Sequence, residues 1–232
     1  MPDWISYYAG LIAKGLQTTL SLLVISALLG FALAVLVALA RLSRRKWLAR
    51  GAQAYTSVLR GTPLLIQIYI FYYGLGSLFA QFPMIRGSFL WPYLRDGYWY
   101  IVFALVLSVG AYVGEVIRGG LLAVPKGEME AASAFGMTPR QALLRVRLPR
   151  AMRLLLPTLA GETVMLLKST ALASTIAVVD LLGAANVVRA QTLQIYQPLL
   201  LVAAVYLCLT FLIEGVYAIA ERRGTPLRRS AG

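Results

Sequence analysis

Histidine is absent from the 232-residue chain, and Cys208 is its only cysteine. The absence of histidine excludes His-based metal sites and histidine acid–base catalysis, and a single cysteine cannot form an internal disulfide. We therefore expect no metal site. No paired-carboxylate motif and no G-x-S-x-G motif is present either, so nothing in the sequence favours an enzyme. The N-terminus lacks a basic region before a short apolar stretch, and we expect no removable signal peptide.

Acidic residues are also scarce, with 9 Asp and Glu against 22 Lys and Arg, a formal net charge of +13. Charged residues make up 13% of the chain and hydrophobic residues 59%. A soluble domain of this length needs more surface charge, so the composition indicates a membrane protein. The basic residues form short clusters between long apolar runs, which favours loops beside an anionic lipid surface over a nucleic-acid partner.

Five segments are long and apolar enough to cross a bilayer, which needs about 20 mainly apolar residues. The second is interrupted near its start by Arg60 and by the turn residues Thr62 and Pro63. We expect an all-α integral membrane fold with five transmembrane helices in a single domain, residues 1–232. The expected spans are residues 16–40, 57–80, 98–118, 154–179 and 198–220.

Lysine and arginine are distributed unequally between the two sides of these spans. The positive-inside rule then predicts an external N-terminus and a cytoplasmic C-terminus. The predicted external side has Lys14, Arg86, Arg95 and Arg189. The predicted cytoplasmic side has Arg41, Arg44, Arg45, Lys46, Arg50, Lys126, Arg140, Arg145, Arg147, Arg150, Arg153, Arg222, Arg223, Arg228 and Arg229.

The segment between the third and fourth spans, residues 119–153, is predicted to form a cytoplasmic helical hairpin. A short helix over residues 128–135 has acids in its first turn, and Gly136 is placed to end it in the left-handed conformation. Thr138 and Gln141 then form a capping box for a second helix, which we expect Leu148-Pro149 to end. Small residues and one phenylalanine at the tip form a knob that can enter a groove of another protein.

This hairpin resembles the EAA loop of ATP-binding-cassette importer permeases. The matching residues are Glu130, Ala131, Ala132, Gly136 and the stretch Val146-Arg147-Leu148-Pro149, in which Val146 replaces the usual isoleucine. The stretches "LRGTPLLIQIYIFYYGLG", "AYVGEVIRGGLLAVPKGEMEAA" and "GETVMLLKSTALASTIAVVDLL" are similar to permeases for histidine, lysine, arginine and opines. Together these stretches extend the resemblance over most of the chain.

The resemblance implies a permease subunit of the bacterial inner membrane that imports a polar, basic or opine-like amino acid. It implies docking on a cytoplasmic ATPase through Glu130, Ala131, Ala132, Phe135 and Gly136. The chain has no phosphate-binding loop of its own, so a partner subunit would bind the ATP and the chain would need no cofactor. The implied partners are a second, identical or related permease subunit, two ATPase subunits and an external substrate-binding protein.

Two ionisable residues fall within the fourth span, where a buried charge needs protein or water around it. At 100° per residue, Glu162, Met165 and Ser169 share one helix face, whereas Lys168 points elsewhere. In one interpretation this face lines the translocation path, and Glu162 contacts a cationic group of the substrate. In the other, Glu162 bonds to a neighbouring helix and only stabilises the bundle. For Lys168 a structural role is favoured over contact with the substrate.

Three further features allow a structural or a functional interpretation. Glu115 and Arg118 have the i,i+3 spacing of an ion pair. Thr62 and Pro63 form either a hinge or gate, or an ordinary proline-tolerant helix start. Glu214 has no assigned role. The competing functions are a permease for another small polar solute and a self-sufficient transporter or channel, which would normally need more spans or an internal repeat.

Overall fold

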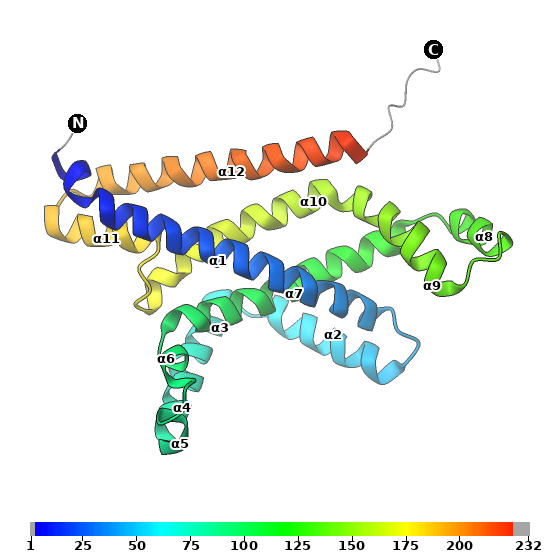
Figure 1. Cartoon of the computed structure of the whole chain (residues 1–232), viewed down its shortest axis with the longest axis horizontal. Helices are drawn as coiled ribbons and strands as arrows, with labels where there is room; N and C mark the ends of the chain where they lie inside the picture. The colour runs from blue at the N-terminus through cyan, green and yellow to red at the C-terminus, as the bar shows by residue number, and fades with distance from the viewer. Residues whose placement is uncertain (1–2, 225–232) are drawn as a thin grey trace, which may run out of the picture.

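The computed structural model describes residues 3–224, which form helices and no strand (Figure 1). Arg228 and Arg229, as well as the side chain of Arg223, lie outside this description. The helices are α1 Asp3–Arg41, α2 Lys46–Gly61, α3 Leu64–Tyr69, α4 Gly76–Gln81, α5 Pro83–Arg86, α6 Trp91–Leu94, α7 Gly97–Ala123, α8 Lys126–Ala134, α9 Pro139–Ala142, α10 Leu148–Ser169, α11 Leu181–Thr192 and α12 Tyr196–Gly224. Irregular helical turns join some of them: η1 Ile70–Leu75, η2 Leu143–Arg147 and η3 Thr170–Ile176.

Four helical segments within residues 3–224 are long and apolar enough to span a membrane, or five if a bent pair counts as one span. The four are Ile5–Arg41, Leu64–Gln81, Gly97–Ala123 and Tyr196–Arg222. The bent pair joins Pro139–Ile176 to Leu181–Thr192 with a 48° change of direction. The all-α membrane fold with five crossing segments is therefore confirmed.

The bend lies where the expected fourth span ended. Ala177 takes a left-handed φ of 61°, which stops the helical turn η3. Asp180 then caps α11, since its side chain accepts hydrogen bonds from the backbone nitrogens of Leu182 and Gly183 at 3.3 and 2.9 Å. Residues 181–192, which the sequence analysis left as a connection, are thus a helix.

The second span begins later than residue 57. Residues 57–61 belong to α2, a separate helix that packs on α1 and α7. Thr62 and Pro63 have extended backbones, because proline lacks an N–H group and disfavours helical geometry in the residue before it. The apolar segment therefore starts at Leu64. Tyr55 anchors α2 by donating to the carbonyl of Leu107 at 2.7 Å, and burial raises the pKa of Tyr55 to about 12.

Helices α1 and α7 form the centre of the bundle, and α10 packs on α7. The two central helices approach closely at Gly110, where a Cβ atom would lie 2.7 Å from Cγ of Leu33. Small residues permit such close packing between membrane helices. Two buried clusters result, one around Leu22, Ile101, Leu105 and Leu167, the other around Ile117, Leu121, Ala151 and Leu155.

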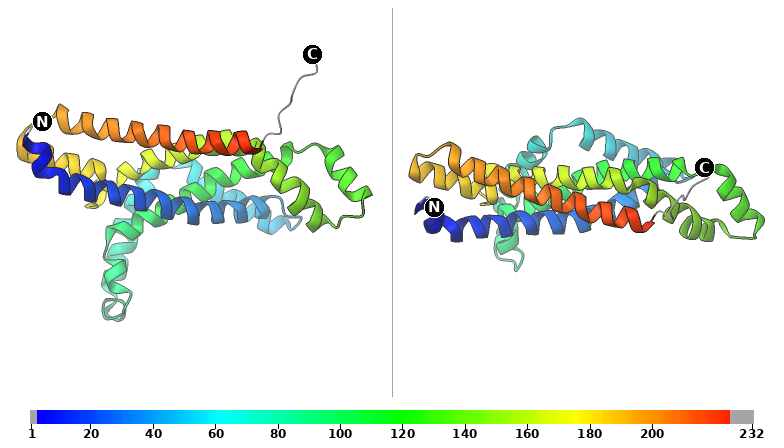
Figure 2. Two further views of the ribbon diagram at one scale, coloured as in Figure 1. Left: turned by 45° about the horizontal axis from the view of Figure 1, so that its top comes forward. Right: turned by 90° about the horizontal axis from the view of Figure 1, so that it is seen from above.

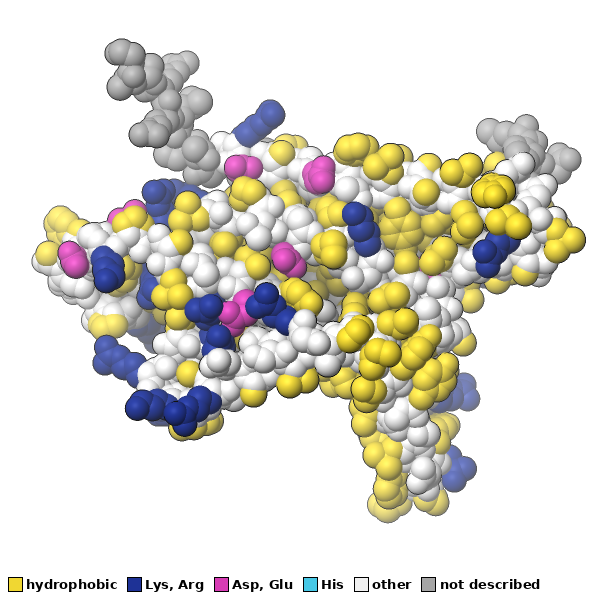
Figure 3. Space-filling model, turned by 180° about the vertical axis from the view of Figure 1, so that it is seen from behind, with side chains coloured by type: hydrophobic (Ala, Val, Ile, Leu, Met, Phe, Trp, Pro, Cys, Tyr) yellow, Lys and Arg dark blue, Asp and Glu magenta, His cyan; other side chains and the backbone are white. Residues whose placement is uncertain are grey.

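The molecule has two projections at different places. Helices α4, α5 and α6 form an arm that leaves the bundle sideways, while α8 and α9 extend it at the end opposite the N-terminus (Figures 1 and 2). Hydrophobic side chains cover much of the arm, and lysine and arginine gather near the α8 end (Figure 3). This separation agrees with the predicted cytoplasmic position of the basic loops.

Candidate functional site

A cavity of about 470 Å³ lies between α1, α3, α7, α10 and α12. Its wall is mainly apolar and includes Glu162, Met165 and Ser169 from α10, together with Tyr112 of α7 and Tyr217 of α12. The three α10 residues that share a face by helical periodicity therefore line one cavity. Aromatic rings and a few polar groups around an apolar space are typical of a small-molecule site.

Within the described part of the chain, Glu162 is the only charged residue in the cavity wall, and its side chain is half-buried. Among residues 3–224 its carboxylate has no hydrogen bond and no ion pair within 4.0 Å. The hydroxyl of Ser169 donates to the carbonyl of Met165 at 2.8 Å, which leaves its oxygen lone pairs available to accept. The α10 wall can therefore accept hydrogen bonds from a cationic group.

Two hydroxyl groups in the cavity wall, those of Thr163 and Tyr217, contact each other. Thr163 donates to the carbonyl of Leu159 at 2.8 Å, so the 2.9 Å contact with Tyr217 has the tyrosine hydroxyl as donor. This contact joins α10 to α12 beside Glu162. Its effect is to fix the wall of the cavity in position.

Lys168 lies away from this cavity. It lines a second space of about 310 Å³ between α10, α11 and α12, with Leu182 and Tyr206. The structure thus brings Glu162, Met165 and Ser169 together and separates Lys168 from them. The structural role that the sequence favoured for Lys168 stays a prediction.

Thr62 and Pro63 form a corner between α2 and α3 that Gln67 closes. The side-chain nitrogen of Gln67 donates to the carbonyls of Leu59 and Thr62 at 2.9 and 3.1 Å and to the Thr62 hydroxyl at 2.9 Å. Gln67 is buried, and the sequence analysis missed it. Its position could have been noticed from the sequence, because a polar residue that follows a proline by one helical turn inside an apolar run needs a hydrogen-bond partner.

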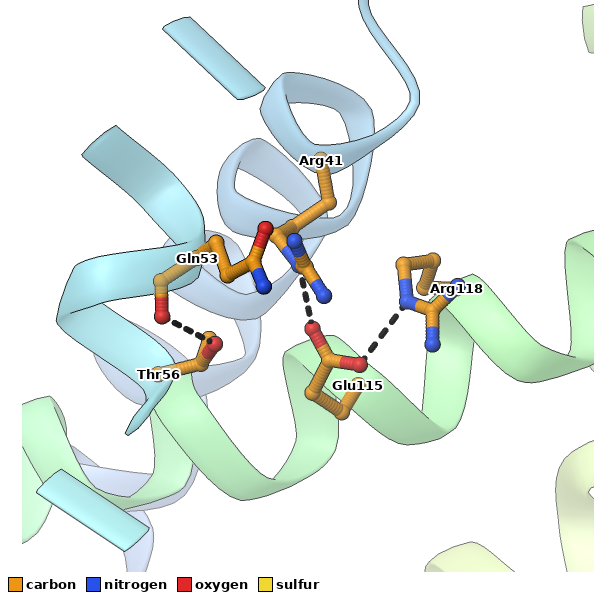
Figure 4. Close-up of polar contacts among 5 residues, drawn as sticks. All are labelled: Arg41, Gln53, Thr56, Glu115 and Arg118. Atoms are coloured by element: carbon orange, nitrogen blue, oxygen red, sulfur yellow. Dashed lines mark hydrogen bonds and ion pairs between the residues drawn. The ribbon is translucent and has the colours of Figure 1, made fainter. Parts of the chain in front are cut away.

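Glu115 pairs with two arginines at the end of α7 near the basic loops (Figure 4). Its carboxylate oxygens lie 2.7 Å from Nε of Arg41 and 2.8 Å from Nε of Arg118. The expected i,i+3 ion pair is confirmed, and Arg41 extends it to α1. Nearby, Thr56 donates to the carbonyl of Gln53 within α2, so the cluster lies where three helices meet.

The hairpin formed by α8 and α9 has the local geometry that its sequence predicts. Gly136 takes a φ of +71°, and the nitrogens of Gly136 and Met137 bond back to the carbonyls of Ser133 and Ala132 at 3.0 and 3.1 Å. This is the Schellman motif, which ends α8. Thr138 and Gln141 form the capping box of α9.

The tip between α8 and α9 exposes a large apolar side chain. Phe135 is 85% exposed, and Glu130, Ala131 and Gly136 are exposed beside it. Ala132 is buried and packs the hairpin internally. An isolated exposed phenylalanine on a stiff two-helix frame is suited to insertion into a groove of another protein.

The hairpin is attached to the ends of two long helices. Nε of Arg147 donates to the carbonyl of Leu121 in α7 at 2.7 Å, and Arg150 lies 3.4 Å from Glu128 of α8. The expected helix end at Leu148-Pro149 is wrong, because the π-helical turn η2 carries α9 directly into α10. The wider π-helical turn accommodates the proline that an α-helical register would exclude.

A helical bundle with membrane-spanning segments, a mainly apolar cavity with one carboxylate in its wall and a two-helix hairpin at one end is consistent with the membrane component of a transporter. Residues 28–225 match the family described as binding-protein-dependent transport system inner membrane component, and the chain belongs to this family. It is 41% identical to the octopine transport system permease protein OccM of Rhizobium radiobacter, covering 98% of this chain and 90% of that protein.

Two further comparisons agree. The chain is 35% identical to the histidine/lysine/arginine/ornithine transport system permease protein HisM of Escherichia coli strain K12, covering 90% of this chain and 87% of that protein. A crystal structure of an amino acid ABC transporter with histidines superposes with a TM-score of 0.81 at 32% identity. That match covers 96% of this chain and 99% of the other. The chain is an inner-membrane permease of ABC importers and not an enzyme.

Proposed function

We propose that this permease moves a basic or opine-like amino acid into the cytoplasm through the cavity around Glu162. The observation that carries the proposal is the Glu162 carboxylate, which lies in the wall of a mainly apolar cavity and has no hydrogen bond or ion pair within residues 3–224. Ionisable groups inside membrane segments commonly mark substrate pathways. The names of the relatives, octopine permease and histidine/lysine/arginine/ornithine permease, support the same substrate class.

The working assembly that we propose contains this chain with a second, identical or related permease subunit. Two cytoplasmic ATPase subunits bind the ATP and receive the tip around Phe135, and the permease has no cofactor of its own. A substrate-binding protein delivers the substrate from outside. The N-terminus lies outside and the C-terminus in the cytoplasm, where the basic loops face anionic lipid.

Thr62 and Pro63 are the proposed gate or hinge of this assembly. They separate α2 from the spanning segment, and the chain changes direction between two helix ends there. The hydrogen bonds from Gln67 hold the corner in the described conformation. A movement of α2 relative to the span would concentrate its dihedral changes at these two residues.

The substitution Glu162→Gln tests the path assignment, because it keeps the shape of the side chain and removes the charge. Uptake of arginine, histidine or octopine into proteoliposomes with ATP and saturating binding protein should fall at least tenfold, about 1.4 kcal/mol. Uptake of a neutral polar amino acid, if it is transported, should fall less. Glu214→Gln on the exposed face of α12 is the matched control and should retain full uptake.

Unchanged basic-substrate transport by a well-folded Glu162→Gln protein would return Glu162 to a structural role. Preferential transport of a neutral solute by the wild type would favour the alternative of another small polar substrate. Both outcomes leave the family membership intact and change only the substrate class.

A further inference from the structure

Arg60 lies at the end of α2, beside the middle of the spanning helix α7. Its guanidinium carbon is 5.4 Å from the ring centroid of Tyr112, and its carbonyl accepts from the Tyr112 hydroxyl at 3.4 Å. Tyr112 lines the cavity and is near the midpoint of Gly97–Ala123. The arginine is therefore held at membrane depth, where an ionised side chain needs a polar partner.

Arg60 lies against Tyr112, which lines the same cavity as Glu162 but belongs to a different helix. Arg60 and Glu162 form no ion pair within 4.0 Å among the described residues. Arg60 is exposed, and its guanidinium lies over the face of the Tyr112 ring. Two opposite charges thus lie near the cavity without neutralising each other directly.

We propose that Arg60 binds the carboxylate of the substrate while Glu162 binds its cationic group. A guanidinium presents paired N–H donors that match a carboxylate, and stacking on Tyr112 limits the orientations that it can take. The cavity then selects molecules that carry both charges, such as an amino acid or an opine. This assignment rests on the proposed function and adds a specificity-determining residue to it.

Arginine and agmatine test the assignment, because agmatine is arginine without its carboxylate. Binding of each is measured to the purified permease–ATPase complex in nanodiscs without binding protein, so that only the membrane site contributes. Arg60→Gln should weaken arginine binding at least tenfold and change agmatine binding less than twofold. Glu162→Gln should weaken both ligands. Arg60→Lys should restore part of the arginine affinity.

Arg50→Gln is the matched control, since it removes an exposed arginine from the same helix away from the cavity. It should leave both ligands unaffected, and copurification of the ATPase checks that each variant is folded. Equal weakening of arginine and agmatine by Arg60→Gln, or no effect on arginine, would overturn the assignment while leaving the importer function in place. A wild-type complex that binds neither arginine nor octopine would instead contradict the proposed substrate class, and this assignment with it.

Discussion

At the scale of single residues, charges inside the bundle are of two kinds. Glu115 has two arginine partners within 2.8 Å, so its charge is neutralised by the fold. Glu162 faces a cavity and lacks such partners within residues 3–224. An unpaired carboxylate in a region of low dielectric constant attracts a cation more strongly than it would in bulk water. The first kind stabilises the fold, and the second is the group that we propose binds the substrate.

Glu115→Gln should destabilise the protein by about 1.5–3 kcal/mol, because it removes two charge-assisted hydrogen bonds and leaves two partly buried arginines unpaired. Unfolding in detergent by a chemical denaturant measures the loss. Glu128→Gln is the matched control: its partner Arg150 is 3.4 Å away and 49% exposed, so the cost should stay below about 1 kcal/mol. Equal losses in the two variants would contradict the structural role of the Glu115 cluster.

Helical periodicity alone placed Glu162, Met165 and Ser169 on one face, since they belong to one continuous helix and 100° per residue fixes their directions. The same reasoning could not predict that Arg60 lies beside the cavity-lining Tyr112, or that Gln67 closes the corner at Thr62. Those residues come from other helices, and their positions depend on how α2, α3 and α7 cross. Periodicity within one segment contains no information about such crossings.

At the scale of elements, the hairpin was the part most readily predicted. Gly136 ends α8, and Thr138 and Gln141 cap α9. Each bonds to backbone groups only a few residues away, so the sequence alone predicts these helix ends. The π-helical turn η2 and the helix α11 were not predicted. Both depend on how the chain packs around a proline or a buried Asp180, which composition does not reveal.

Phe135→Ser should reduce copurification of the ATPase at least tenfold, about 1.4 kcal/mol, while the permease stays in the membrane. The side chain is 85% exposed, so its loss should not affect folding. Phe89→Ser is the matched control, because Phe89 is 83% exposed and lies between α5 and α6 in the arm. The arm projects from the bundle away from the hairpin (Figure 1). Retention of the ATPase and of full uptake by Phe135→Ser would contradict the docking assignment.

At the scale of the whole molecule, the basic residues and the hairpin lie at the same end of the bundle, as the predicted orientation in the membrane requires. The hairpin and the C-terminal end of α12 lie towards the same end of the bundle, opposite the N-terminus (Figure 1). Basic side chains gather near the hairpin (Figure 3). The side of the membrane that the basic loops face stays a prediction, but the number of crossing segments was readable from the sequence. The sideways arm was not, because hydropathy gives the length of a span and not its direction.

Reporter fusions test this orientation directly. A reporter placed after Gly232 should be active in the cytoplasm, and one inserted near Arg86 in the arm should be active outside. The charge asymmetry and an odd number of crossings between the termini are the reasons for this expectation. Activity of both reporters on the same side would overturn the five-span topology.

ATP-dependent uptake is the most direct test of the central claim, that this chain is a permease driven by a separate ATPase. The purified chain is reconstituted into vesicles with and without its ATPase, in the presence of binding protein and radiolabelled arginine. We predict uptake only when both the ATPase and ATP are present. Equal uptake by the permease chain without any ATPase would contradict the account and identify a self-sufficient transporter or channel.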